Sequence, residues 1–141
     1  YKDGTKKYPY VIHRTSLGCY ERTLALLIEK FGGAFPTWLA PVQVKILPIT
    51  DSHLAYAEEI KKELMQKRVR CEIDSRNEKI GYKIRAAQLE KVPYMLVLGD
   101  REAEEGTVSL RKRGEKGNLG VLSVEDVIAR LTQEIADKTM D

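Results

Sequence analysis

Three short apolar segments, separated by two helical patterns, constrain the fold more than any other feature of this chain. The segments cover residues 42–49, 69–74 and 94–98, and the third, Tyr94-Met95-Leu96-Val97-Leu98, is apolar at every position. A strand that is apolar on both faces is typical of the middle of a parallel sheet. The order strand, helix, strand, helix, strand therefore predicts an α/β domain with right-handed crossovers.

Each of the two helical patterns has one apolar face. The first runs from about residue 53 to 67, after Asp51 and Ser52, which are typical N-cap residues. Its inner face consists of Leu54, Ala57, Ile60 and Leu64. The second begins after the polar stretch 75–79, and its inner face consists of Ile80, Ile84 and Ala87. Both spacings are those of helices that cover a sheet.

The chain after residue 98 departs from this alternation. Residues 107–111 and 119–122 flank a basic, polar segment and predict a hairpin. Ser123-Val124-Glu125-Asp126 is similar to a capping box, with Asp in place of Glu or Gln, and predicts a final helix that packs across the sheet. We therefore expect an α/β fold with a mixed sheet of five strands and helices on both faces.

Residues 1–36 predict a separate unit. Residues 8–14 have the pattern of a strand, and apolar residues from about Leu17 to Phe31 recur at helical spacing until Gly32-Gly33. This strand and helix would expose a large apolar face unless something absent from the chain covers it. Because the chain also begins with Tyr rather than Met, we expect it to be a piece of a longer polypeptide.

An apolar, proline-punctuated connector, Phe35–Pro41, joins the two units. Its two bulky aromatic residues make it too apolar for a free linker, so we expect it to pack down and fix the geometry between the units. The alternative is an ordinary surface loop. We place the domain boundary here and divide the chain into residues 1–36 and 37–141.

Composition and motifs exclude several function classes. The net charge of +3 is too small for a strongly basic nucleic-acid coat, so a nucleic-acid site would be local. No run approaches the roughly 18 apolar residues that cross a bilayer, and we expect a cytoplasmic protein without a membrane partner. Cys19 and Cys71 fit neither a metal pair nor a disulfide framework. No phosphate-binding glycine loop, nucleophile elbow or metal-spaced histidine pair occurs, which indicates a binding module.

A stretch of cationic and planar donors follows the second apolar segment. Residues 75–85, Ser-Arg-Asn-Glu-Lys-Ile-Gly-Tyr-Lys-Ile-Arg, place Arg76, Asn77, Lys79, Lys83 and Arg85 on a turn and the start of a helix. Asn and Arg can pair with base edges, and Arg and Lys attract phosphates. The plainer interpretation is a solvated helix face.

Polar residues from three segments are expected to converge beyond the strand ends. In an α/β sheet, ligands bind beyond the carboxyl ends of the parallel strands. Asn77, Lys79 and Arg85 follow one strand end, Gly99-Asp100-Arg101-Glu102 follows the next, and Arg111 lies on the hairpin alongside. A single-stranded RNA loop suits such a site, because splayed bases offer hydrogen-bonding edges next to phosphates.

Several runs resemble the anticodon-binding domain of class II aminoacyl-tRNA synthetases, and within that class the threonyl-tRNA synthetases of bacterial type. These runs are residues 76–85, residues 92–100 and the C-terminal hairpin. Upstream, Ile12-His13-Arg14, Gly18, Glu21-Arg22 and residues 34–44 resemble the end of the catalytic domain and its passage into the anticodon domain. The resemblance covers nearly the whole chain.

The resemblance implies specific residue roles. The residues that it implies in anticodon binding are Asn77, Lys79, Arg85, Glu102 and Arg111. Glu102 and Arg111 would read the bases. Arg22 matches a catalytic arginine that binds ATP and stabilises charge on the α-phosphate, and His13 matches one ligand of a catalytic zinc. Cys19 stands where the family has a small hydroxyl residue.

For the longer enzyme, the resemblance implies threonine–tRNA ligase activity with ATP, magnesium and zinc, and a homodimer that pairs through the catalytic domain. This chain lacks the other zinc ligands and most of the active site, so we expect it to be inactive as a ligase and to need no cofactor. Because the family pairs through its catalytic domain, we expect the chain to be a monomer. Its expected partner is the anticodon loop of tRNA.

Other interpretations stay open at this point. Arg22 could be an exposed helix cation, His13 a core or edge-strand histidine, Glu102 a member of the acidic loop 102–105, and Arg111 part of a basic tip that keeps an edge hairpin from aggregating. The domain could belong to a prolyl, histidyl or glycyl enzyme, to a non-catalytic accessory tRNA-binding protein, or to a small-molecule nucleotide-binding class.

Overall fold

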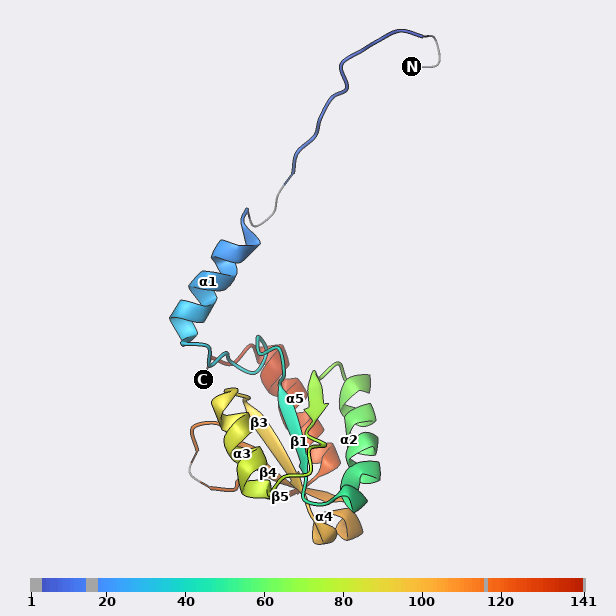
Figure 1. The fold of residues 1–141 in the computed structure, drawn as a ribbon, viewed down its shortest axis with the longest axis vertical. Coiled ribbons are helices and arrows are strands. Elements are labelled where there is room, and N and C mark those ends of the chain that lie inside the picture. Colours follow the sequence, from blue (N-terminus) through green and yellow to red (C-terminus); the bar gives the residue numbers. More distant parts are fainter. Residues whose placement is uncertain (1–3, 15–17, 116, 141) are drawn as a thin grey trace.

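A mixed five-stranded sheet lies at the centre of the fold in this computed structural model, which describes residues 4–14, 18–115 and 117–140 (Figure 1). The strands are β1 (Val44–Pro48), β2 (Cys71–Ile73), β3 (Tyr94–Leu98), β4 (Thr107–Lys112) and β5 (Gly120–Ser123), in the order β2-β1-β3-β4-β5. β1 runs parallel to β2 and β3, whereas β4 is antiparallel to both β3 and β5. The five-stranded mixed sheet and the central place of the all-apolar strand are thus confirmed.

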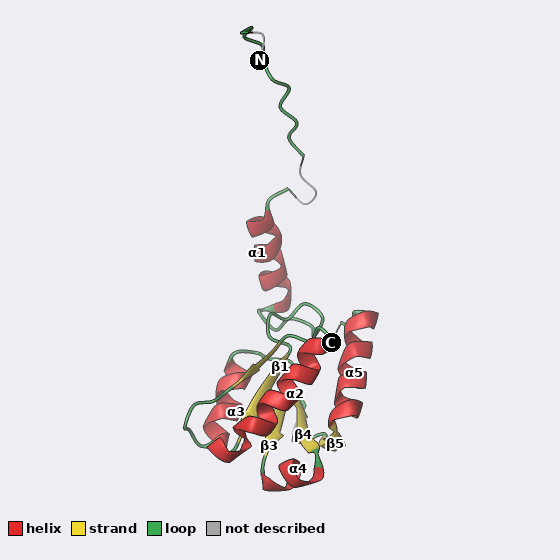
Figure 2. Cartoon of the chain, turned by 90° about the vertical axis from the view of Figure 1, so that its right-hand side faces the viewer, coloured by secondary structure: helices red, strands yellow, loops and turns green. Residues whose placement is uncertain are grey.

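Helices cover both faces of the sheet. α2 (Leu54–Gln66) and α5 (Val124–Asp137) pack on one face and build the larger core, while α3 (Ile80–Leu89) packs on the other face (Figure 2). The larger core includes Ile60 and Leu131, and the smaller core consists of Leu47, Ala87 and Met95 with partly buried neighbours. Since side chains alternate along a strand, Ile46 joins the larger core and Leu47 the smaller one.

The N-cap of α5 agrees with the prediction, whereas the start of α2 differs from it. Ser123 caps α5 as expected, since its Oγ accepts a hydrogen bond from the Asp126 amide at 3.1 Å. A 3-10 turn, Asp51–His53, precedes α2, and the residue at its N-cap position is Thr50. The predicted capping role of Asp51 and Ser52 is therefore wrong, because the turn starts earlier and places them inside its first turn.

A short helix, α4 (Asp100–Glu105), follows β3 where the sequence suggested an acidic loop. It begins after Gly99 and ends at Gly106, which has a φ of 66°. Asp100 and Glu102 lie in its first turn, near the positive end of the helix dipole, where carboxylates stabilise a helix. The loop interpretation of residues 102–105 is therefore wrong.

The N-terminal region projects away from the sheet (Figures 1 and 2). It contains α1 (Tyr20–Phe31), which ends at Gly32 and has no buried residue, whereas Leu17 lies outside the described residues. The strand predicted for residues 8–14 is wrong: these residues are not in a strand, and Tyr8, Tyr10 and Ile12 are at least 90% exposed. A strand needs a hydrogen-bonded neighbour, and none of the described residues supplies one.

The connector packs down, as predicted, and it does so at the amino ends of the parallel strands. Thr37 and Ala40 are buried, and Gln43 Nε2 donates to the Thr37 carbonyl at 2.9 Å. Arg70 donates to the carbonyls of Trp38 and Ala40. Arg113 donates to those of Ala34 and Phe35. The connector is therefore held mainly through its main-chain oxygens.

In the three described ranges, no helix has both the length and the apolar character required to pass through a membrane.

Candidate nucleic-acid interface

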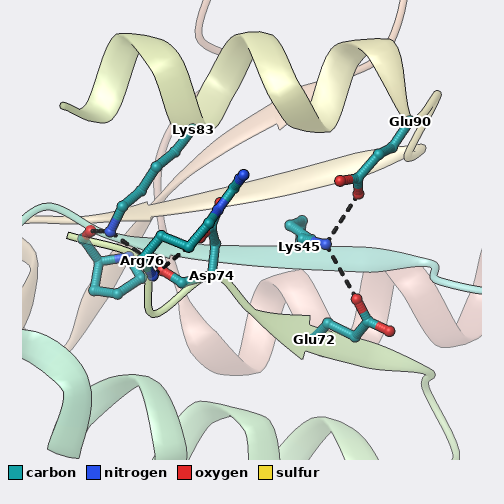
Figure 3. A network of polar contacts seen from close by, with 7 residues as sticks. Lys45, Glu72, Asp74, Arg76, Lys83 and Glu90 are labelled. Atoms are coloured by element: carbon teal, nitrogen blue, oxygen red, sulfur yellow. Dashed lines mark hydrogen bonds and ion pairs between the residues drawn. The ribbon is translucent and has the colours of Figure 1, made fainter. Parts of the chain in front are cut away.

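Two cations of the stretch 75–85 stabilise the turn between β2 and α3 (Figure 3). Arg76 donates to both carboxylate oxygens of Asp74, from Nε at 2.8 Å and from Nη2 at 2.5 Å, and its guanidinium lies 5.6 Å from the centre of the Tyr82 ring. The side-chain hydrogen bond from Arg76 is the main cause that lowers the pKa of the nearly buried Asp74. Arg76 therefore stabilises the turn.

Lys83 is the second structural cation of this stretch. It is only 3% exposed, and its Nζ donates to the carbonyls of Pro48 at 2.9 Å and Asp74 at 3.2 Å (Figure 3). These two carbonyls lie just at or beyond the ends of β1 and β2. An ammonium buried in this way ties α3 to the carboxyl edge of the sheet and is not available to a ligand.

The three remaining donors of the stretch, Asn77, Lys79 and Arg85, are exposed. Within the described part of the chain, their side chains form no hydrogen bond or ion pair. Lys83 points toward β2, and Arg85, two residues later, lies about 200° around the helix from it. Because Lys83 is buried against the sheet, Arg85 lies on the solvent-exposed side of α3.

β4 presents a row of polar side chains on the face of the sheet that α3 only partly covers. Ser109 pairs with Val97 and Arg111 with Met95, so both share the face on which Val97 and Met95 pack against α3. On β5, Val121 pairs with Ser109 and is 53% exposed. This half of the face, which we call the open face, consists of Thr107, Ser109, Arg111 and Val121.

Two buried polar atoms on the open face have no partner. Thr107 Oγ1 and Arg111 Nε form no hydrogen bond with any described residue, whereas Ser109 Oγ accepts one from Asn118 Nδ2 at 2.5 Å. Most buried donors and acceptors in proteins are paired, so an unpaired atom indicates water or a ligand. Both atoms lie on the same side of β4, towards its two ends, so the open face carries unpaired polar groups along its length.

Glu102 borders the open face from α4. One of its carboxylate oxygens, Oε2, accepts a hydrogen bond from the Gly99 amide at 3.0 Å. A surface pocket of about 230 Å³ is lined by Arg101, Glu102, Glu105, Thr107 and Val121. Glu102 therefore shares a pocket with two members of the open face. Arg111 pairs with Met95, three residues before the end of β3. It therefore lies roughly 10 Å along the sheet from the edge where α4 begins.

The structure thus separates the predicted site residues into one group on or near the sheet and another in the N-terminal region. Glu102 and Arg111 border or form the open face, and Asn77 and Lys79 lie just before α3 at the carboxyl edge of the sheet. Arg85 lies on the exposed side of α3. The sequence-based prediction missed Thr107, Ser109 and Asn118. Its available signal was the alternation Thr107, Ser109, Arg111, which places three polar side chains on one face of a strand.

The other group, His13 and Arg22, lies in the N-terminal region. His13 is exposed before α1, and Arg22 is exposed on α1, away from the sheet (Figure 1). No three His, Cys, Asp or Glu side chains among the described residues come together as a metal site. Since zinc in a catalytic site takes three protein ligands, the described residues alone do not fit a zinc ion.

Comparison with known proteins identifies the domain. A family model described as an anticodon-binding domain matches residues 43–134. The chain is 56% identical over 137 residues to a threonine–tRNA ligase of Clostridium perfringens strain SM101, which covers 97% of the chain and 21% of that protein. It is 55% identical over 139 residues to a threonine–tRNA ligase of Desulforamulus reducens, which covers 99% of the chain and 22% of that protein.

A solved structure agrees with the sequence relatives. It is the crystal structure of the RNA-binding domain of threonyl-tRNA synthetase from Cryptosporidium parvum Iowa II, with a TM-score of 0.75 and 32% identity over 80% of this chain and 28% of that one. The chain spans about a fifth of the length of its curated relatives. With the matched fold and the family model over most of its sheet and helices, the chain belongs to the anticodon-binding domain family and is homologous to threonine–tRNA ligases.

Proposed function

We propose that this chain binds the anticodon loop of threonine tRNA through the open face, as the C-terminal portion of a threonine–tRNA ligase. The observation that carries the proposal is the pair of unpartnered polar atoms, Thr107 Oγ1 and Arg111 Nε, on a strand face bordered by Glu102. Single-stranded bases supply the donors and acceptors that such atoms lack. The identity to threonine–tRNA ligases favours threonine tRNA over proline, histidine and glycine tRNAs.

Glu102 and Arg111 have the chemistry to discriminate between bases. All threonine codons begin with A and C, so every threonine anticodon contains a central guanine followed by uracil. The Watson–Crick edge of guanine carries N–H groups that the free Oε1 of Glu102 accepts, and its O6 accepts from the guanidinium of Arg111. Glu102 Oε2 is already fixed by the Gly99 amide, which leaves one oxygen for a base.

Asn77 and Lys79, from the turn before α3, and Arg85, from the exposed side of α3, complete the proposed site. Their exposed side chains, which have no hydrogen bond or ion pair with other described residues, suit the phosphates and unstacked bases of the loop. Contacts with phosphates release counterions, so affinity falls as salt rises. These three residues would position the loop, while Glu102 and Arg111 read its sequence.

The N-terminal region is proposed to belong to the ligase's catalytic domain, with the boundary after residue 36. There Arg22 would contact ATP, whose phosphates also bind magnesium, and His13 would supply one ligand to zinc, together with residues outside this chain. Because the described residues do not fit zinc by themselves, no catalytic step follows from this chain alone. We also propose that the full-length ligase is a cytoplasmic homodimer and that the isolated chain is a monomer.

The test is fluorescence titration of the chain with transcripts of threonine, proline, histidine and glycine tRNA. We expect threonine tRNA to bind most tightly, and replacement of its central guanine to weaken binding by roughly 5- to 150-fold. Glu102→Ala and Arg111→Ala should remove most of this preference, whereas Glu104→Ala, on the same helix, should leave it intact. Equal affinity of all four tRNAs, or an unchanged preference in both variants, would refute the proposal.

A further inference from the structure

A buried histidine connects α4 to the turn that follows β1. His53 is 5% exposed, and its ring lies between Thr50 and Asp100, the first residue of α4. The distance is 2.8 Å from Nε2 to Asp100 Oδ1 and 3.0 Å from Nδ1 to Thr50 Oγ1. Both ring nitrogens are therefore engaged, although the partner on α4 is a largely exposed carboxylate.

The hydrogen bonds around the ring indicate which of its two nitrogens carries the hydrogen. The Thr50 amide lies 3.4 Å from Nδ1 and can only donate, so Nδ1 is the acceptor. Nε2 then carries the hydrogen and donates it to Asp100. A neutral imidazole in this tautomer acts as a fixed strut from the end of β1 to the start of α4.

The start of α4 is also where Glu102 is held. Glu102 Oε2 accepts from the Gly99 amide, one residue before Asp100, so the carboxylate follows any movement of this helix start. α4 has only six residues, none of them is buried, and it packs mainly along β4. The bonds at its first turn therefore contribute to its orientation.

We infer that His53 is a positioning residue for anticodon recognition: through Asp100 it fixes the start of α4 and thereby aims the Glu102 carboxylate at the base. This inference rests on the proposed function of Glu102. His53 itself does not touch the RNA, because its ring is buried and both of its nitrogens already have protein partners.

Gly99 provides a second route to the same carboxylate. A methyl group at this position would lie 2.9 Å from Glu102 Oε2 and 3.0 Å from Ile49 Cδ1. Both neighbours are ends of flexible side chains, so the chain can fold around an alanine, but the carboxylate has to move. Gly99→Ala is therefore expected to displace Glu102 without altering the His53 strut.

The experiment measures the ratio of affinities of the full chain for threonine tRNA and for the same transcript with its central guanine replaced by adenine. Asp100→Ala breaks the strut from its exposed end, and His53→Leu breaks it from the buried end. We expect each to lower the ratio roughly fivefold, the equivalent of one hydrogen bond. His53→Gln, whose amide can still donate to Asp100, should keep most of the wild-type ratio. Gly99→Ala should lower the ratio.

The decisive measurement combines Asp100→Ala with Glu102→Ala. If the strut acts through Glu102, the double variant has the same ratio as Glu102→Ala alone. Multiplicative losses, or an unchanged ratio in a folded Asp100→Ala chain, would overturn the inference while leaving the proposed function in place. An unchanged ratio in Glu102→Ala would instead remove the proposed base reader, and the inference with it.

Discussion

Arg76 donates two hydrogen bonds to the carboxylate of Asp74, at 2.8 Å and 2.5 Å, within the turn that joins β2 to α3. The donor-rich stretch therefore contains two kinds of cation that look alike in the sequence. Arg76 and Lys83 hold the turn in place. Lys79 and Arg85 have no partner among the described residues and are therefore available to a ligand. This division allows folding and RNA binding to be tested separately.

Replacement of Arg76 by alanine should make the fold more sensitive to acid. The hydrogen bond from Arg76 lowers the pKa of Asp74 below its ordinary 3.8, so this carboxylate stabilises the fold above pH 3.8 and loses the effect as pH falls through its lower, folded-state pKa. Without Arg76, acid unfolding should begin at a higher pH. A pH titration by circular dichroism measures this, with the exposed Arg101→Ala as control; coincident curves for both variants would contradict the prediction.

Lys83→Met should affect mainly stability, whereas Lys79→Met should affect mainly tRNA binding. Methionine at position 83 leaves the Pro48 and Asp74 carbonyls without their buried donor, which should lower the free energy of unfolding by about 1–3 kcal/mol. Lys79 is exposed, so its replacement should change stability by no more than about 0.5 kcal/mol but weaken tRNA binding and reduce its salt dependence. Urea unfolding and titrations at several salt concentrations distinguish the two. Equal stability of the two variants would show that the buried ammonium is dispensable.

Tyr94 should make the fold sensitive to alkali. Burial and the 2.6 Å hydrogen bond to Glu134 raise the pKa of Tyr94 to about 12 from 10.0. The protonated phenol therefore stabilises the fold below pH 10, and this contribution, on the order of 2 kcal/mol, declines as pH rises toward 12.

Tyr94→Phe should cost about 1 kcal/mol at neutral pH and remove this part of the alkaline loss. Urea unfolding of both chains at pH 7 and at several values above pH 10 provides the comparison. The exposed Tyr82→Phe serves as control. Parallel stability curves for the wild type and Tyr94→Phe above pH 10 would argue against the assignment.

Arg113→Met should release the upstream end of the connector. The variant loses the guanidinium bonds to the carbonyls of Phe35 at 2.8 Å and Lys91 at 2.6 Å, at a cost of about 1–3 kcal/mol. Trp38, the single tryptophan, lies in this connector and reports on its environment. We expect its fluorescence emission to shift to longer wavelength, whereas the exposed Arg130→Met should leave it unchanged; an unshifted spectrum in Arg113→Met would mean that the connector stays docked.

The order of the elements was predictable because hydrophobic periodicity encodes burial. Tyr94–Leu98 is apolar at every position, and it occupies the centre of the sheet with helices on both sides. The same logic failed for residues 8–14, where the pattern of a strand has no partner among the described residues. Strand pattern reports what a segment can pair with, not whether its partner is present.

The candidate site was predictable only in part. The sequence located Glu102 and Arg111 through their resemblance to a family, but their relation to Thr107 and Ser109 depends on the register of β3 and β4, which the sequence does not state. Lys83 had a readable signal: it follows Ile80 by three residues and so lies on the inner face of α3. Its charge suggested solvent, and its burial follows from two carbonyls contributed by other segments.

The connector's attachment has a consequence for sequence variation. Arg70, Arg113 and Gln43 hold it through the carbonyls of residues 34, 35, 37, 38 and 40, and every amino acid provides a carbonyl. Thr37 is an exception, because its buried hydroxyl also donates to Glu134 Oε1 at 2.5 Å. The other connector side chains are free to vary wherever packing permits, while the three donors are not. Related chains should therefore keep Thr37 and the three donors more strictly than the other connector positions, although two of the donors, Arg70 and Arg113, lie far from the connector in sequence.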